Sequence, residues 1–533
     1  MQLNKYTCFT LMLFFFIGCD EIHLKVPSRE PPSSSESTTI FDASTTEAFP
    51  EEFVEQIEKR IIPEQNSIET DNPEDAVYQE PAFERIPEKR PDDGSWAKKT
   101  TALRGSSNRL VVDSASNVYQ AGDFIGSVTI EKKVYPSQNN NRLMLTKWNK
   151  IGKWIWTTIL TSTKSIRVND ILIDEGRKQL LLTGTFQGTI LLGKTKWSSE
   201  NYRSSYIVGM NLQGKILWAQ LLKSTKEIIS ENLTSGPKGS LLVSGHFSGK
   251  VQLGTVSLDA KKGEGLFILN LGKDNKWKWG AQAHMPNGSS HHLSSKGLIS
   301  KPGKHIIVLV SFQRDMTVGK IKLSTEDGHI WQFLAGLDHT GNWLWAKKIG
   351  IRGELQVNAL ASSNTGKLYA TGWFSKEKRF GKTLLHPEAQ GNTNHIFVAE
   401  LDWNGEWLWA NYAGSPTAIE NSHDLAIDPQ ENLLVTGIFR DKSHFGHIPL
   451  VPGVRTDVFV ACLSPKGKWL WAKKATSQND VISANIVSDR EGRVIIDGIF
   501  WENVTLEGIK LQGPANANTL FIWKLPRNPG KTP

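Results

Sequence analysis

A tryptophan-bearing segment recurs seven times in this chain, at intervals of 60 to 66 residues. Two well-preserved copies read Gly341-Asn-Trp-Leu-Trp-Ala-Lys-Lys and Gly467-Lys-Trp-Leu-Trp-Ala-Lys-Lys. The paired tryptophans stand at i and i+2, which places them on one face of a β-strand. A fixed period of this size indicates an array built from one supersecondary unit. The residues that anchor the seven copies are Trp96, Trp156, Trp218, Trp279, Trp345, Trp409 and Trp471.

A second landmark in each unit is a phenylalanine, in six copies two residues after a glycine. The fourth copy has Val310 in place of this glycine. Upstream lies a turn that opens with aspartate in four copies, and aspartate closes hairpins through its own side chain. A further strand, such as Ile396-Phe-Val-Ala-Glu-Leu, precedes the tryptophan strand. Four strands per unit are typical of a propeller blade, so we predict an all-β chain. The residues at these two landmarks are Phe124, Phe186, Phe247, Phe312, Phe374, Phe439 and Phe500, and Asp113, Asp174, Asp428 and Asp489.

The two ends of the array predict how the ring closes. The N-terminal copy supplies only a tryptophan strand, Ser95 to Lys99, whereas the C-terminal copy stops after Leu520-Phe-Ile-Trp-Lys-Leu. Each end therefore holds what the other lacks, and pairing them would remove two open sheet edges. An open solenoid would leave two unfinished blades. We predict a seven-bladed β-propeller of four-stranded blades over residues 94–526, closed by its N- and C-terminal strands and followed by a short tail, 527–533.

The fifth and sixth units resemble a known repeat. The run that begins Ile396-Phe-Val-Ala-Glu-Leu-Asp-Trp-Asn-Gly-Glu-Trp-Leu-Trp-Ala and continues at Asp428-Pro-Gln-Glu-Asn-Leu-Leu-Val-Thr-Gly-Ile-Phe is similar to the bacterial β-propeller repeats called SBBP. The resemblance implies a secreted or surface-anchored protein and brings no common enzymatic activity with it. A looser similarity connects the chain to quinone-cofactor propellers and to the propeller lipoprotein of the outer-membrane barrel assembly machine.

The N-terminus indicates export. Lys5 is followed by a short apolar stretch that ends in Phe16-Ile-Gly-Cys19. This pattern is typical of a secretory signal peptide, residues 1–18, and is too short for a spanning helix. Cysteine after Ile-Gly matches the bacterial lipobox, so we predict lipidation of Cys19 and a location in the bacterial cell envelope. A short membrane anchor with an incidental cysteine is the alternative, and the sequence leaves the inner and outer membranes both open.

Residues 19–93 form the predicted tether. They are rich in Glu, Pro, Ser and Thr, and such a composition buries too little apolar surface to fold. Within it, residues 51–61 could form a short amphipathic helix, since Phe53, Ile57 and Ile61 fall on one face. Cys462 has no partner for a disulfide if Cys19 is lipidated, and it falls in a strand column of the repeat, so we interpret it as an incidental strand residue.

Charge is divided between the two parts of the chain. The tether holds 20 acidic and 7 basic residues, a net charge of −13, whereas residues 94–533 carry a net charge of +20. A field of this sign attracts anionic polymers, such as acidic polysaccharide, lipid headgroups or nucleic acid. An exported chain without a nucleic-acid module makes nucleic acid the least favoured of these partners. The alternative is a solvated, lysine-rich surface that binds no anionic ligand.

Catalytic signatures are sparse in the sequence. It contains no Gly-x-Ser-x-Gly elbow, His-Glu-x-x-His helix, phosphate loop or paired-cysteine zinc pattern. His284, His291 and His292 follow the fourth tryptophan strand and are weak metal candidates, because the stretch reads as a loop without a fixed carboxylate. Off the repeat column, Trp197, Trp373 and Trp501 could stack on sugars.

These observations favour a monomeric, lipid-anchored propeller without a cofactor that acts as a binding or scaffold module. Two alternatives stay open. One is an enzyme that uses the central pocket, such as a quinone- or metal-dependent oxidoreductase or a polysaccharide lyase. The other is a scaffold for envelope assembly, bound to other envelope proteins.

Overall fold

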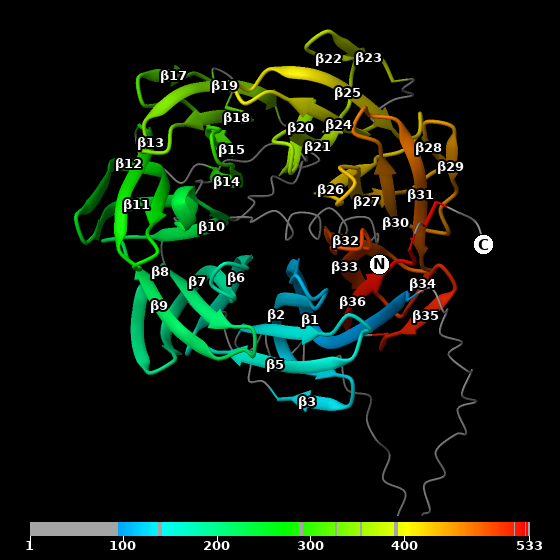
Figure 1. Ribbon diagram of the computed structural model, residues 1–533, viewed down its shortest axis with the longest axis horizontal. Helices are drawn as coiled ribbons and strands as arrows, with labels where there is room; N and C mark the ends of the chain where they lie inside the picture. Colours follow the sequence, from blue (N-terminus) through cyan, green and yellow to red (C-terminus); the bar gives the residue numbers. More distant parts are fainter. Residues whose placement is uncertain are drawn as a thin grey trace, which may run out of the picture. The chain divides into compact units, whose positions relative to one another are not determined.

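The computed structural model describes residues 94–136, 141–286, 292–325, 328–351, 354–387, 393–515, 517–527 and 529–530. The predicted signal peptide, Cys19, the tether with its 51–61 segment, and His291 lie outside these residues. The described part is all-β, as predicted, and its one helical segment is a three-residue 3₁₀ turn, Pro237–Gly239. Figure 1 shows sheets arranged in a ring, the arrangement of a β-propeller.

Five blades are separate antiparallel meanders of four strands. In chain order, from the innermost strand of each blade outward, they are β6(Ser165–Asp174), β7(Gln179–Leu192), β8(Thr195–Asn211) and β9(Ile216–Leu222); β10(Ile228–Ser235), β11(Leu241–Leu253), β12(Val256–Leu271) and β13(Trp277–Met285); β14(Leu293–Ser300), β15(Ile306–Gln313), β18(Ile330–Leu337) and β19(Trp343–Ile351); β20(Leu355–Ser362), β21(Leu368–Phe374), β24(His395–Leu401) and β25(Trp407–Ala413); and β26(Asn421–Ile427), β27(Leu433–Phe439), β30(Asp457–Leu463) and β31(Trp469–Thr476). The tryptophan segments form the last strand of each of these blades.

The remaining large sheet has eight strands and joins the two ends of the chain. Its order is β32(Val481–Ser488), β33(Val494–Phe500), β36(Asn518–Lys524), β1(Trp96–Val112), β2(Val118–Ile130), β4(Arg142–Trp148) and β5(Trp154–Leu160), with β3(Lys133–Tyr135) paired to β2. The first half of β1 pairs with β36, from Trp96 opposite Lys524 to Ala102 opposite Asn518. Its second half pairs with β2. The predicted pairing of the terminal strands is therefore present, and one unbroken strand carries the chain from it into the next four-stranded run.

A small hairpin at the periphery of the ring was not predicted. Four copies are separate strand pairs: β16(Met316–Val318) with β17(Ile321–Leu323), β22(Lys378–Phe380) with β23(Thr383–Leu385), β28(Ser443–Phe445) with β29(Ile448–Leu450), and β34(Asn503–Leu506) with β35(Ile509–Gln512). In the first three units the same turn is the tip of a longer hairpin. β16 also pairs with β13, and β34 with β31, so these two hairpins continue the sheet of the preceding blade.

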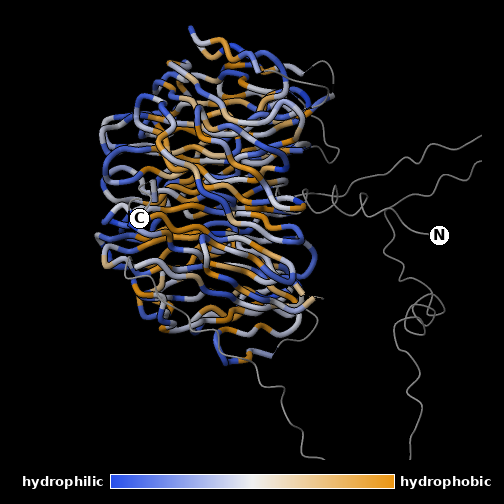
Figure 2. Tube along the Cα trace, turned by 90° about the vertical axis from the view of Figure 1, so that its right-hand side faces the viewer, coloured by the Kyte–Doolittle hydropathy of each residue, from blue (hydrophilic) through white to orange (hydrophobic). Residues whose placement is uncertain are grey.

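Apolar side chains fill the spaces between blades, and Figure 2 shows the hydrophobic strands inside and the hydrophilic turns outside. All seven landmark phenylalanines are buried. One cluster joins the two ends of the chain, because Trp96 and Phe124 pack with Ile495 and Ile522. Burial of a contiguous apolar core by neighbouring repeats explains why such units are stable only side by side.

The anchoring tryptophans also hold blade to blade. A Cβ placed on Gly405 would lie 2.6 Å from the ring of Trp345, and one on Gly467 would lie 2.7 Å from the ring of Trp409. Each of these glycines lies in the turn before the tryptophan strand of the next blade, with φ near +80°. Glycine is thus required for its backbone conformation and for the close approach of an indole.

Candidate functional site

A ring of β-bulges surrounds the axis of the propeller. Each innermost strand of a four-stranded run skips one position in its pairing with the next strand, except β32, which skips two. Bulges re-aim a side chain and are frequent beside functional sites. The residues left unpaired, which we call the axial belt, are Asn108, Asn169, Glu231, Lys296, Asn358, His423, and Ala484 with Asn485.

The axial belt hydrogen-bonds each blade to its neighbour. Asn169 Nδ2 donates to the carbonyl of Ser230 at 2.6 Å, and His423 Nδ1 donates to the carbonyl of Ser483 at 2.7 Å. Asparagine and histidine can both act as donors here. The belt is therefore a polar seam between innermost strands, and repeat period alone did not reveal it, because its residue types differ from unit to unit.

Glu231 departs from this pattern because a carboxylate only accepts. It accepts from the Ser295 amide and from Ser294 Oγ, both at 2.6 Å. His246 Nδ1 lies 3.4 Å from the second Glu231 oxygen. Burial lowers the pKa of His246, but the Glu231 carboxylate outweighs burial and raises it; burial raises the pKa of Glu231, and His246 in turn outweighs this and lowers it. The two therefore form an ion pair beside the axis.

Two other carboxylates near the axis resist ionisation. Burial raises the pKa of Asp424 to about 6, although Asp424 accepts from the amides of Leu425 and Ile486. Burial likewise raises the pKa of Asp497. The Asp497 carboxylate bonds to Ser107 and Gln120, which lie on β1 and β2. Asp497 thus makes a polar contact between the last and first parts of the ring.

The predicted site residues fall into different places. Of the anchoring tryptophans, Trp96 is buried and the other six are half-buried. Cys462 lies on β30 opposite Trp471 and is buried, which raises the pKa of its thiol. The turn aspartates accept from backbone amides of their own turns; Asp428 Oδ1, for example, accepts from Gln430 and Asn432 at 2.8 Å.

The histidine candidates are not brought together as a loop cluster. His284 lies on β13, not in a loop, because β13 continues to Met285 where it pairs with both β12 and β16. Its pKa is lowered, mainly by burial. Among the described residues, no group of three or more His, Cys, Asp or Glu side chains is placed to hold a metal ion. The off-column tryptophans Trp197, Trp373 and Trp501 are all half-buried.

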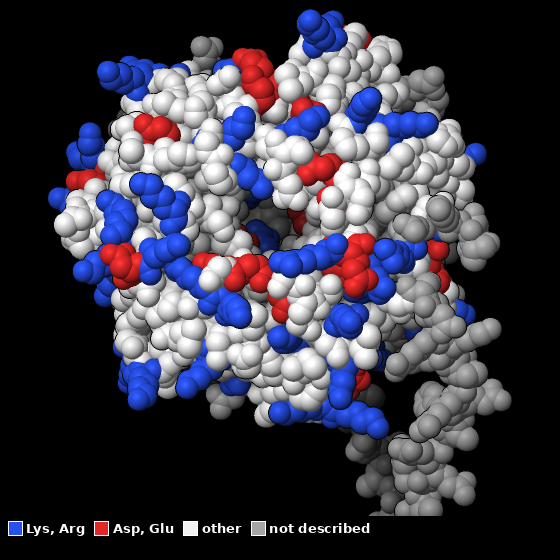
Figure 3. Space-filling model, viewed as in Figure 1, with Lys and Arg blue, Asp and Glu red and all other residues white. Residues whose placement is uncertain are grey.

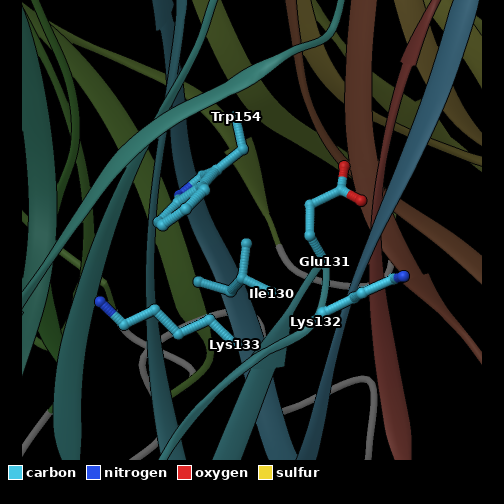
Figure 4. Close-up of a pocket in the computed structure, with 5 residues that line it drawn as sticks. All are labelled: Ile130, Glu131, Lys132, Lys133 and Trp154. Atoms are coloured by element: carbon cyan, nitrogen blue, oxygen red, sulfur yellow. The ribbon is translucent and has the colours of Figure 1, made fainter.

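One shallow depression lies on the outside of the ring, at the hairpin of the first unit (Figure 4). Ile130, Glu131, Lys132, Lys133 and Trp154 line it. The sequence analysis treated Trp154 as one member of a repeated pair and gave no reason to single it out. Its environment differs from that of the other tryptophans because the hairpin turn of its unit differs.

The face shown in Figure 3 carries many lysine and arginine side chains, with fewer acidic ones among them, and is hollowed at its centre. Within the described part of the chain, no helix is long and apolar enough to cross a bilayer.

Comparison with known proteins supports no closer assignment. No family model and no curated protein matches the chain. Among solved structures, the Pan2 WD40 domain of Neurospora crassa is similar over 80% of this chain and 95% of its own, with 10% identity and a TM-score of 0.38. A putative gluconolactonase is similar over 82% and 94%, with 13% identity and a TM-score of 0.28. A glucose dehydrogenase is similar over 79% and 98%, with 9% identity and a TM-score of 0.28. Similarity at this level bears on neither ligand nor chemistry.

Proposed function

We propose that the ring is a seven-bladed propeller. The eight-stranded sheet contains two four-stranded runs that share β1: β32, β33, β36 and the first half of β1, and then the second half of β1 with β2, β4 and β5. Together with the five separate blades they give seven, which matches the seven tryptophan segments of the sequence.

We further propose that this propeller is an exported lipoprotein, anchored through Cys19, that binds an anionic polymer at the bacterial cell envelope without catalysis. The observation that carries the proposal is the net charge of +20 on residues 94–533, beside a tether of net charge −13. Such a surface raises the local concentration of anionic ligands. The lipobox and the resemblance to SBBP repeats support the location.

The tether provides the test. A covalently held acidic segment competes at high effective concentration for the same basic surface. Deleting residues 20–93 should therefore tighten binding to an acidic polysaccharide, and binding should weaken steeply with salt, because exposed charges are screened beyond about 10 Å at 0.1 M. The matched control keeps the tether length and replaces its Asp and Glu by Asn and Gln. It should bind like the deletion variant.

Equal affinity of all three proteins would show that the tether is only a spacer. No binding of any of them to acidic polysaccharide at low salt would overturn the proposed ligand. Affinity purification from membranes would identify envelope-protein partners instead, the result expected of an assembly scaffold.

A second candidate function is an enzyme that uses the axial pocket. The Glu231–His246 pair favours it, because a carboxylate that orients an imidazole is an arrangement used in acid–base catalysis. A chromophore or a metal retained by the purified protein would support this alternative.

A further inference from the structure

The hairpin of the first unit breaks a rule that the other units follow. In five units the hairpin turn opens with a glycine of φ 58–66°, namely Gly193, Gly254, Gly319, Gly381 and Gly446. The last unit has Glu507 followed by Gly508. The first unit has Glu131 and Lys132, with no glycine in the turn, and Glu131 itself takes φ 53°. A non-glycine residue in this region carries backbone strain, and such strain points to a function at the position.

Replacement of the glycine changes what lies against the neighbouring tryptophan. In the fourth unit, a Cβ placed on Gly319 would lie 3.0 Å from the Cβ of Trp343, so the turn packs against that residue. In the sixth unit, the corresponding distance from Gly446 to Trp469 Cδ1 is 3.3 Å. The equivalent tryptophan of the first unit is Trp154, and there the depression opens between the turn and the ring.

The groups around this depression have complementary chemistry. Trp154 Nε1 donates to Thr157 Oγ1 at 2.9 Å, which satisfies its polar edge and leaves the ring as an apolar surface. Lys133 Nζ lies 4.8 Å from the Tyr135 ring centroid and 5.8 Å from that of Trp154, distances of a cation–π contact. Figure 4 shows Trp154 and Ile130 across the depression from each other, with Lys133 on one side and Glu131 and Lys132 on the other.

The charge of the depression is positive on balance. Glu131 forms an ion pair of 3.1 Å with Lys98, and Lys132 and Lys133 add two further ammonium groups. An aromatic face, flanking ammonium groups and one carboxylate together fit a pyranose ring that bears a carboxylate. The apolar face of the sugar would lie on the indole, its carboxylate would face Lys133, and a hydroxyl would donate to Glu131.

We propose that these five residues, the Trp154 site, bind an acidic sugar residue of the uronic acid type within a polysaccharide. The inference rests on the proposed function, since it names the ligand class and the place where the anionic polymer is recognised.

The test measures binding of the full-length protein to polygalacturonate, with a neutral glucan and phosphatidylglycerol vesicles as comparison ligands. Trp154→Ala should weaken polygalacturonate binding about tenfold or more, as expected for an aromatic anchor. Trp343→Ala is the matched control, because Trp343 occupies the same repeat position but is covered by its turn. It should leave binding unchanged.

Lys133→Met tests the charge without removing a packed side chain. It should weaken polygalacturonate binding several-fold, whereas Lys194→Met, an exposed lysine in the turn of the second unit, should not. If the wild type binds polygalacturonate and all four variants bind equally, the general basic surface is responsible: the Trp154 site is then wrong and the proposed function stands. If the wild type binds the vesicles but not polygalacturonate, or binds neither, both proposals for a sugar ligand fail.

Discussion

At the scale of single residues, this propeller depends on where a side chain cannot be accommodated and where a charge is unwelcome. The turn glycine of one blade receives the tryptophan of its neighbour. Around the axis, acidic side chains are satisfied by amide donors of the next blade, as Asp424 Oδ2 is by the Ile486 amide at 2.9 Å. Both features are contacts between units, so their energies measure how blades adhere.

The glycine contact can be separated from backbone strain. Gly405→Ala should lower the free energy of unfolding by about 2–4 kcal/mol, because the new methyl meets Trp345 and the residue must keep φ +78°. Gly303→Ala is the control, since Gly303 has φ +69° and open space around it. The difference between the two variants in denaturant unfolding reports the contact, and equal losses would contradict it.

The buried carboxylate predicts a pH dependence. The pKa of Asp424 is about 6 in the folded protein against an ordinary value of 3.8. The folded state therefore holds more protons between about pH 4 and 6, and stability falls as pH rises through this window. Asp424→Asn removes the fall, so its melting midpoint relative to wild type should rise between pH 4 and pH 7, by the equivalent of about 1–3 kcal/mol.

Asp338→Asn should behave in the opposite way. Burial opposes ionisation of Asp338, but hydrogen bonds from Thr340 and Asn342 outweigh it and hold its pKa below the ordinary value. Its ionised form therefore stabilises the fold above pH 4, and the Asn variant should be the less stable one there. The same pH profile for both variants would refute the assignment.

At the scale of elements, closure depends on a strand that belongs to two runs. β1 gives its first half to β36 and its second half to β2. The closing strand β36 carries Lys524, whose ammonium lies 2.7 Å from the Asp489 carboxylate, and both side chains are buried. A buried charge of this kind is tolerated because it is paired. At the other end, Gly530 lies against the ring of Trp471, where other blades place a turn glycine.

Deleting residues 94–99 should open this closure. Trp96 is 8% exposed, and its indole donates to the Lys150 carbonyl at 3.1 Å. Loss of one buried tryptophan costs about 3–5 kcal/mol, and the exposed edge of β36 should promote association. Trp96→Ala is the control that keeps the strand. It should melt early but stay monomeric in size-exclusion chromatography, and an unchanged, monomeric deletion variant would contradict the closure.

At the scale of the whole molecule, the chain combines a basic ring, of net charge +20, with an acidic segment of net charge −13. The ring distributes its lysines over its surface, as Figure 3 shows for one face. Long-range attraction of this kind acts on association rates and salt dependence more than on the fold.

Anchoring is tested separately from ligand binding. Cys19→Ser should abolish incorporation of a clickable fatty acid and release the protein without detergent. Its melting midpoint should not change, because Cys19 precedes the ring by more than 70 residues. Persistent label on the Ser variant would disprove lipidation at Cys19, and loss of label with unchanged membrane retention would indicate a protein partner.

The sequence by itself determined the repeat, the strand class of each landmark and the pairing of the chain ends, because these depend on periodic burial and on local turn chemistry. Trp96 opposite Lys524 is such a case. Only the tertiary structure revealed the axial belt, the buried Asp424 and the exposed setting of Trp154. These features depend on which residue of the next blade lies opposite, and a bulge or a missing glycine changes that neighbour without altering the period. His284 was misplaced for the same reason, since pairing with β16 extends its strand beyond what local composition indicates.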